Sequence, residues 1–458
     1  MLFHTWTFAF FFLVFYSVYV AVKGTRLRLP WLLVASYVFY ACWNPLYLIL
    51  VLWSTSVDFL AVVGMTRTRW RRPWLVFSIV NNLGLLGFFK YGRFAADNLS
   101  ALLAWLNVPY EVPAPGFLFP VGISFYVFRS MSYTIDCYRG NVEREPSFVR
   151  YAAFVALFPQ LLAGPIDRAG SLLPQLRRTP RISRQDVADG LSLFAVGLFK
   201  KVALADYLAV YVDQVYALPG ECEAPALLLA TFAFAWQIYF DFSGYTDMAR
   251  GIARLMGIRL MLNFNNPYLA TGLGDFWRRW HISLSTWFRD YLYIPLGGSR
   301  KGTFRTYRNL CLVMVVSGLW HGAAWTFVLW GAVHALGYSL TRSLERTSFY
   351  AQRVPRLAKQ LLTFSIVSFA WIFFRAESIS DAWLVVTRIC RFGLADPAFP
   401  LWALVLILSV WLYQFAYESR FRPILGMAPV RIGLVVCMVF YLAVVGSSGA
   451  QEFIYLQF

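Results

Sequence analysis

Apolar stretches long enough to cross a lipid bilayer follow one another along almost the entire chain of 458 residues. A helix needs roughly 20 mostly apolar residues for one crossing, because each backbone polar group must find its partner inside the segment. Only 14% of the residues are charged, whereas soluble proteins average about 25%. We therefore expect an all-α polytopic membrane protein that forms a single membrane-embedded domain over residues 1–458. The candidate spans are residues 2–22, 29–43, 46–64, 73–91, 117–137, 187–212, 226–249, 305–320, 323–341, 360–375, 399–416 and 431–448.

Several of these stretches are short, so their number stays open by one or two. Basic residues gather in every second loop between them, as in residues 67–72, 139–150 and 250–259, while the intervening loops are neutral or acidic. Short basic loops stay on the cytoplasmic side of a membrane. The alternation therefore predicts that both termini lie outside. It also explains the net charge of +18 by membrane topology, so lipid rather than nucleic acid is the expected contact.

The six cysteines form no C-x-x-C pair and show no metal-ligand spacing, so we expect neither a disulfide framework nor a metal site. Residues 2–22 lack a basic start and a small-residue cleavage site. This stretch is interpreted as a retained first helix rather than a cleaved signal.

Two segments break the simple pattern of spans. Residues 148–164 are apolar but have basic loops on both sides, so we expect a re-entrant segment that ends at Gly164 and Pro165. Residues 255–304 are polar and aromatic and lie between basic flanks, which places them on the cytoplasmic side. Irregular backbone at membrane depth is tolerated where protein covers it or a cavity wets it. The sequence therefore predicts a cavity that opens from the cytoplasm.

Residues 277–291 have the spacing of one amphipathic helix. Its apolar face would carry His281 together with several aromatic residues, among them Trp277, Trp280 and Trp287. Arg278 and Arg279 would point to phosphate groups of lipid or of an anionic ligand. The loop 295–302 adds glycines and two further cations, Arg300 and Lys301, although it lacks the spacing of a known phosphate loop. These four cations are the candidate donor-binding residues; a buried, structural role for His281 stays open.

His321 lies at the junction of two apolar stretches, after Trp320 and between Gly318 and Gly322. An ionisable side chain at membrane depth is expensive and is by default a candidate functional site. Histidine can accept a hydroxyl proton and return it near neutral pH, which suits attack of an alcohol on a thioester. A polar linker between two helices is the alternative. His334 would point to the opposite side of a helix and is assigned a structural role, as is His4.

A polar run lies in the cytoplasmic half of the stretch 226–249. Gln237 and Asp241 are one turn apart and can hydrogen-bond, and Asp247 can pair with Arg250. Asp241 could orient an imidazole, or it could pair with a cation from another apolar stretch. Such cations are Lys200, Lys201 and Arg129.

At these residues the chain resembles the membrane-bound O-acyltransferase family, most closely its bacterial branch that acetylates alginate. The resemblance runs over the whole chain. It is carried by residues 157–165, 239–248, 263–268, 275–291, 294–298, 318–322 and 453–458.

The resemblance implies a ring of about eleven to twelve transmembrane helices with re-entrant segments around a tunnel, and a catalytic core of about residues 226–345. The family's invariant histidine corresponds to His321 and its second histidine to His281. Family members move an acyl group from a cytoplasmic thioester, acetyl-CoA or the phosphopantetheine of an acyl carrier protein, so no tightly bound cofactor is expected. The implied partners are periplasmic SGNH-type acetyltransferases, a polysaccharide secretion complex and, for a carrier-bound donor, the carrier protein.

The sequence thus predicts an inner-membrane acetyltransferase for O-acetylation of an exopolysaccharide, with alginate as the expected polymer. His321 would be the general base, or would carry the acetyl group transiently, and His281 would line the donor path or share proton transfer. Asp241, Gln237, Trp320 and Trp280 are the supporting residues. Two alternatives are kept: D-alanyl transfer to teichoic acid, and a transporter without chemistry, for which the chain shows no inverted repeat.

Overall fold

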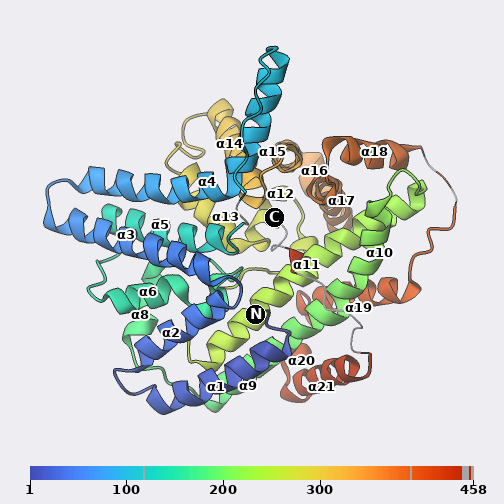
Figure 1. Ribbon diagram of the computed structural model, residues 1–458. Coiled ribbons are helices and arrows are strands. Elements are labelled where there is room, and N and C mark those ends of the chain that lie inside the picture. Colours follow the sequence, from blue (N-terminus) through green and yellow to red (C-terminus); the bar gives the residue numbers. More distant parts are fainter. Residues whose placement is uncertain (117–118, 392, 394, 446–452, 455–458) are drawn as a thin grey trace. The chain divides into compact units, whose positions relative to one another are not determined.

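The computed structural model describes residues 1–116, 119–391, 393, 395–445 and 453–454, and within these residues it contains helices but no strand (Figure 1). The chain divides into two compact units. The first comprises residues 1–191 and 249–261, and the second comprises residues 192–248 and 262–458. The prediction of an all-helical chain is therefore confirmed for the part that the structure describes.

The first unit is built from helices of very different length, together with a short turn, η1 (Pro45–Tyr47). They are α1 (Trp6–Val22), α2 (Arg28–Ala41), α3 (Leu48–Arg67), α4 (Arg71–Trp105), α5 (Ile123–Arg139), α6 (Phe148–Ala156), α7 (Phe158–Leu161) and α8 (Ala169–Arg177). Helix α9 (Arg184–Phe199) begins in this unit, and α11 (Ala224–Leu255) ends in it.

The second unit holds the rest of α9 and α11 and all later elements. They are η2 (Lys200–Ala205), α10 (Asp206–Ala217), η3 (Pro267–Leu269), α12 (Leu273–Arg279), α13 (Ile282–Phe288), η4 (Arg289–Tyr293), α14 (Thr303–His321), α15 (Trp325–Glu345), α16 (Ser348–Arg353), α17 (Arg356–Arg375), α18 (Ile379–Cys390), α19 (Leu401–Tyr417), α20 (Arg422–Gly426) and α21 (Ala428–Val445).

Each of the twelve candidate spans overlaps with helical residues in the described part of the chain; positions 117–118 of the fifth span and 446–448 of the last span lie outside it. Four helical stretches there are both long and apolar enough to cross a membrane, and α1, α19 and α21 are shorter apolar helices. The four are Pro45–Arg67, Arg71–Trp105, Ala224–Leu255 and Arg356–Arg375. The ring of eleven to twelve helices therefore stays a prediction.

The basic loops of the first unit meet one another. Arg28 donates to the carbonyls of Leu176 and Arg178, so the loop before α2 lies against the end of α8. Further contacts join loops that the charge pattern places on the cytoplasmic side: Arg71 with the Tyr138 carbonyl, Arg177 with Glu145, Gln175 with the backbone of Arg259, and Arg254 with Asp186 and Asp189. Loops far apart in sequence thus gather at one end of the unit, as a shared membrane side requires.

The loops of the second unit gather in two sets. One set holds the end of α10 and the end of α17, joined by Arg375 and Asp213, whose nitrogen and oxygen lie 2.8 Å apart. The same set includes the Cys222 carbonyl, which accepts from Arg388. The other set contains Glu418, Arg356 and Arg279, from the opposite ends of the helices. This separation agrees with alternate loops lying on opposite sides.

The segment that was expected to be re-entrant forms two short helices, α6 of nine residues and α7 of four. Neither helix is long enough to span a bilayer, and every residue from 151 to 164 is buried. Arg129 of α5, itself fully buried, donates to the carbonyls of Val155 and Gln160 at the ends of these helices. The segment therefore lies inside the first unit, held by an arginine that satisfies its open backbone groups.

Helices α14 and α15 approach each other closely through glycines. A Cβ atom at Gly318 would lie 2.1 Å from the carbonyl oxygen of Phe327, and one at Gly331 would lie 2.4 Å from that of Met314. Small residues permit this approach, which is a common way to join helices in membranes. The contact fixes the end of α14, where His321 lies.

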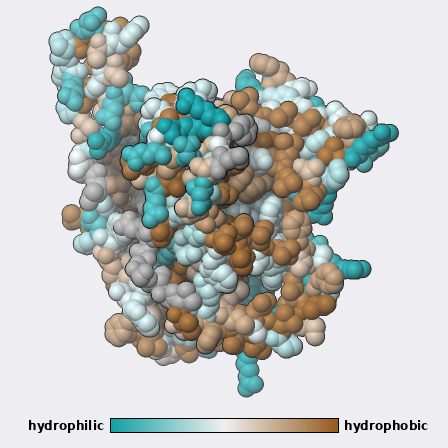
Figure 2. Space-filling view, turned by 90° about the vertical axis from the view of Figure 1, so that its right-hand side faces the viewer, coloured by the Kyte–Doolittle hydropathy of each residue, from teal (hydrophilic) through white to brown (hydrophobic). Residues whose placement is uncertain are grey.

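Apolar side chains cover broad areas of the surface in the view of Figure 2. Large exposed apolar side chains occur along α19 and α21, for example Leu412 at 68% and Phe440 at 68% exposure. A soluble protein rarely exposes such areas. The surface is therefore of the kind that lipid covers.

Candidate active site

His321 is the last residue of α14, and its side chain is 3% exposed. Aromatic rings surround the imidazole: its centroid lies 5.0 Å from Trp320, 5.1 Å from Trp330 and 5.5 Å from Phe374. The predicted position at a helix junction is confirmed. The α14–α15 contact positions this end of the helix, so the ring is held by packing from two helices.

His281 is fully buried, but the helix predicted over residues 277–291 is not continuous. Helix α12 ends at Arg279, Trp280 is extended, and His281 has a left-handed backbone with φ 41° and ψ 54° before α13 begins. The prediction was wrong because side-chain periodicity cannot reveal caps that come from elsewhere in the chain. The Ile282 amide donates to the Asn263 carbonyl, and the Ser283 amide donates to the Asn263 side chain.

Asn263 also fixes the proton on His281. Its Oδ1 atom accepts from the Ser283 amide at 3.1 Å and the Ser283 hydroxyl at 2.9 Å, and it lies 3.2 Å from Nδ1 of His281. An amide donor can only be matched by an acceptor, so this atom is the carbonyl oxygen and His281 must donate from Nδ1. The basic lone pair of the neutral ring therefore lies on Nε2. His281 lies between α12 and α13, which are both too short to span a membrane. Burial lowers the pKa of its imidazole to about 3, so the ring is neutral at physiological pH.

The two histidines lie next to each other in the second unit. Their ring centroids are 6.4 Å apart, and Trp320 contacts both, at 5.9 Å from His281 and 5.0 Å from His321. This separation is too large for a direct hydrogen bond between the rings. The structure thus brings together three residues that the sequence singled out, with Trp320 in contact with both imidazoles.

His334 does not point away from this cluster, contrary to the sequence-based expectation. It is fully buried in α15, with its ring 4.6 Å from Trp330, whose other neighbours include His321. The prediction failed because α14 ends at His321, so the two histidines are on different helices and not on one. Trp280 is likewise fully buried and packs 5.2 Å from Trp371.

Asp241 is paired with a lysine and not with Gln237. Its carboxylate lies 2.9 Å from Nζ of Lys201 and accepts from the backbone amide of Ile454 at 2.7 Å. Lys201 also lies 2.8 Å from Asp206. Lys201 and Lys200 belong to η2, a π-helical turn, and Lys200 pairs with Asp247 at 2.7 Å. The widened turn, of a kind often found at functional sites, thus directs both lysines to carboxylates of α11.

A cavity of about 560 Å³ is lined by Lys201 and the two aspartates that pair with it, Asp206 and Asp241. Asp241, Lys201, Asp206 and Gln237 line it on one side, and Ala324, Thr326, Phe327 and Phe374 on another. Phe374 contacts the His321 ring, and Ala324 lies three residues after His321. The remaining lining residues come from η2, α10, α11, the end of α17 and the segments that follow it; they are Ala205, Ala209, Asp213, Phe234, Arg375, Ala376, Glu377 and Ile454.

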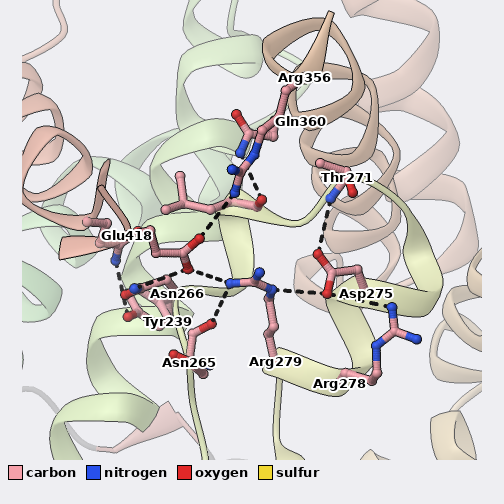
Figure 3. A network of polar contacts seen from close by, with 12 residues as sticks. Tyr239, Asn265, Asn266, Thr271, Asp275, Arg278, Arg279, Arg356, Gln360 and Glu418 are labelled. Carbon is pink, nitrogen blue, oxygen red and sulfur yellow. Dashed lines mark hydrogen bonds and ion pairs between the residues drawn. The ribbon is translucent and has the colours of Figure 1, made fainter. Parts of the chain in front are cut away.

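The four candidate donor-binding cations differ in their surroundings. Arg278 is 75% exposed and lies 3.7 Å from Asp275, whereas Arg279 is mostly buried and pairs with both Asp275 and Glu418. Figure 3 shows Arg279 between these two carboxylates, with Arg356 reaching Glu418 from α17. Arg300 and Lys301 are exposed in the loop before α14. Arg279 thus holds α12 to neighbouring helices, and the other three are accessible to an anion.

Sequence reasoning missed several residues that shape this site. Asn263 belongs to a segment that carried the resemblance, but its contact with His281 spans 18 residues and left no local signal. Trp330 and Phe374 were hidden among many aromatic residues of apolar stretches. Arg375 ends an apolar stretch, and a cation at that position was a signal that could have been used. Across the described ranges, no group of three or more metal-ligating side chains is placed to hold a metal ion.

Comparison with known proteins gives the family of the chain. Residues 127–376 match the sequence model of the membrane-bound O-acyltransferase family. The chain is 43% identical over 401 residues to the probable alginate O-acetylase AlgI of Pseudomonas aeruginosa, covering 86% of this chain and 75% of that protein. It is 36% identical to the peptidoglycan O-acetyltransferase of Helicobacter pylori, covering 77% and 72%, and 26% identical to the teichoic acid D-alanyltransferase of Bacillus subtilis, covering 61% and 74%.

Proposed function

Because the chain belongs to the membrane-bound O-acyltransferase family and is a multi-pass membrane O-acyltransferase, we propose that it transfers acetyl groups for O-acetylation of an exopolysaccharide. The donor is a cytoplasmic thioester, and the acceptor is a hydroxyl group on the periplasmic side of a bacterial inner membrane. Alginate is the proposed polymer, since relatives above 40% identity are named probable alginate O-acetylases.

His321 acts as the general base in this proposal. Its imidazole accepts the proton of the acceptor hydroxyl while the alcohol oxygen attacks the thioester carbonyl. The carbon–sulfur bond then breaks, and the proton passes from the imidazolium to the departing thiolate, so that an ester and a free thiol leave. Atoms and charge balance without a cofactor. Transient acetylation of His321 itself is the variant of this mechanism that stays open.

The observation that carries the proposal is the pair of buried imidazoles beside the 560 Å³ cavity. His281 and His321 lie 6.4 Å apart in an aromatic shell, and Phe374 connects that shell to the cavity wall. Exclusion of water from such a site strengthens its electrostatic interactions and protects an acyl group from hydrolysis. His281, whose lone pair lies on Nε2, lines the donor path or shares proton transfer.

The donor reaches the histidines from the side of the basic loops. Arg278, Arg300 and Lys301 are exposed and would attract the phosphates of acetyl-CoA or of carrier-bound phosphopantetheine. Arg279 supports the same surface through its pairs with Asp275 and Glu418. Trp320 and Trp280 shape the path, while Asp241 and Gln237 line a cavity that extends to Asp213 and Arg375, the end that this proposal places on the acceptor side. A ring of helices around a tunnel would join the two sides.

Replacing His321 with alanine tests the proposal. We expect polysaccharide acetylation to fall by at least about 100-fold, with protein abundance in the membrane unchanged. His321→Asn, which keeps a polar side chain of similar size, should be equally inactive, and His4→Ala is the matched control that should retain activity. Acetylation that persists in the His321→Ala variant would refute the assignment.

The donor is tested with purified protein and labelled acetyl-CoA, in the presence and absence of periplasmic SGNH-type partners. Transfer of label to polymer or partner supports acetyl transfer. If label is transferred from a D-alanyl carrier protein but not from acetyl-CoA, D-alanyl transfer replaces the proposal. A relative that is 26% identical is named a teichoic acid D-alanyltransferase. Passage of the acetyl group without any new ester would indicate a transporter.

A further inference from the structure

The cavity beside His321 carries more negative than positive side chains. Four carboxylates line it, Asp206, Asp213, Asp241 and Glu377, against two cations, Lys201 and Arg375. Each cation already faces an acid: Lys201 bridges Asp206 and Asp241, and Arg375 pairs with Asp213. The described lining therefore has a formal net charge of two negative when all six groups are ionised, and each of its cations is paired with an acid.

Burial makes this charge effective. Lys201, Asp206 and Asp241 are each at most 4% exposed, so bulk water screens them little. Glu377 is exposed and stands at the edge of the cavity. A carboxylate that entered from solvent would meet unbalanced like charges, which is unfavourable at close range in a partly dry space. An uncharged molecule would meet no such barrier.

Gln237 gives an independent indication. Its side-chain oxygen is buried, lines the cavity and has no hydrogen-bond partner among the residues that the structure describes. Gln237 itself is 6% exposed. A buried carbonyl oxygen without a partner is costly, so a donor is expected to reach it in the working protein. An alcohol supplies such an O–H donor, so Gln237 indicates a hydroxyl-bearing ligand, while the charge of the lining decides against a carboxylate on it.

We propose that this cavity selects an uncharged alcohol as the immediate acetyl acceptor and disfavours one that bears a carboxylate. The inference rests on the proposed function, because it concerns the acceptor of the same transfer. Gln237 receives the hydroxyl donor, and Glu377 and the Asp206–Lys201–Asp241 triad set the charge preference. If the final polymer is a polyuronate, a second acyl-transfer reaction must move the acetyl group from the neutral carrier to it.

The transfer test uses the full chain in detergent or proteoliposomes with labelled acetyl-CoA. The two acceptors are a methyl hexoside and the matching methyl hexuronide, which differ in one carboxylate. We expect kcat/KM to favour the hexoside by about fivefold at low salt, and the preference to shrink at 0.5 M salt. Glu377→Gln should lower the ratio of kcat/KM for hexoside to kcat/KM for hexuronide, and Glu377→Lys should lower it further, because each change increases kcat/KM for the hexuronide. Glu221→Gln and Glu221→Lys, which change an acid outside the lining, are the matched controls.

A second test measures the charge of the cavity without catalysis. Ala324→Cys, placed in the lining of a variant whose six native cysteines are serines, is modified with methanethiosulfonates bearing either trimethylammonium or sulfonate. Both reagents react with the thiolate form of the cysteine, so the ratio of the cationic rate to the anionic rate does not depend on how much thiolate is present. We expect the ratio of the cationic rate to the anionic rate at position 324 to be roughly five to ten times the same ratio for Val108→Cys, a position exposed in the loop after α4. Glu377→Lys should reduce that ratio, and Gln237→Leu should leave it unchanged while raising KM for the hexoside.

The outcomes separate the two proposals. Equal use of hexoside and hexuronide, or a rate ratio at position 324 equal to the ratio at the reference cysteine, overturns the charge selection even when acetyl transfer is normal. A clear cation preference in the cavity, together with no transfer from any thioester to any alcohol, overturns the acetyltransferase function but leaves the charge of the cavity established.

Discussion

At the scale of single residues, the environment of each histidine sets its chemistry. Asn263 accepts from Nδ1 of His281 and thereby leaves the basic lone pair on Nε2. His321 has a different environment, with aromatic rings around it and the cavity wall nearby. Motif and composition pointed to both histidines. The tautomer of His281 could not be inferred, because its partner lies 18 residues away on a loop.

Replacing Asn263 with alanine should therefore weaken both structure and activity. The variant removes the acceptor of the Ser283 amide and of His281, so we expect the free energy of unfolding to fall by about 1–2 kcal/mol. The acetyl-transfer rate should fall as well, because Nδ1 of His281 loses its fixed partner. Thermal unfolding in detergent and labelled-acetyl transfer provide the two measurements.

Ser283→Ala is the control for the Asn263 variant, because it removes the hydroxyl donor but keeps the amide that Asn263 caps. It should lose less stability than Asn263→Ala and keep most of the activity. Unchanged stability and rate in Asn263→Ala would show that the asparagine does not position His281.

At the scale of elements, close approaches between helices and breaks within them place the site. The π-helical turn η2 directs two lysines to α11, and the break between α12 and α13 puts His281 in the interior. Helical periodicity correctly predicted that Trp280 and His281 would be buried, but it joined α12 and α13 into one helix. The caps that stop α12 and start α13 come from another segment, so local pattern could not reveal them.

The glycine contact between α14 and α15 offers a test at this scale. Gly318→Ala adds a methyl group about 2.1 Å from the Phe327 carbonyl, and such overpacking typically costs about 1–3 kcal/mol. We expect a lower thermal midpoint and reduced transfer, because the end of α14 carries His321. Thermal unfolding and the transfer assay on the same preparation measure both.

Gly84→Ala is the matched control, since Gly84 also lies in a helix and a Cβ atom there has nothing within 4 Å. Its midpoint should stay equal or rise slightly, because alanine favours a helix more than glycine does. If both variants behave alike, α14 and α15 do not depend on the close contact.

At the scale of the whole molecule, the distribution of charge predicts which loops share a side of the membrane. Within the first unit the basic loops do contact one another, through pairs such as Arg177 with Glu145. Within the second unit the loops at opposite helix ends form separate sets. Each unit is thus consistent with the positive-inside arrangement.

Cysteine labelling tests this topology directly. In a variant without native cysteines, Glu377→Cys should react with a membrane-impermeant maleimide in cells whose outer membrane is permeabilised. Arg178→Cys should react only after the inner membrane is opened, because basic loops stay in the cytoplasm. Labelling of both positions from the same side would refute the assigned orientation and the placement of donor and acceptor.

The sequence by itself determined the helical class and the alternation of apolar stretches with basic loops, because apolar length and loop charge are local properties that do not depend on how the helices are arranged. It also singled out His281 and His321, since ionisable groups are rare in apolar segments. Only the tertiary structure decided the break at His281, the pairing of Asp241 with Lys201 and the cavity beside His321. Those features depend on contacts between residues distant in sequence, whose partners are chosen by packing and charge in the folded chain.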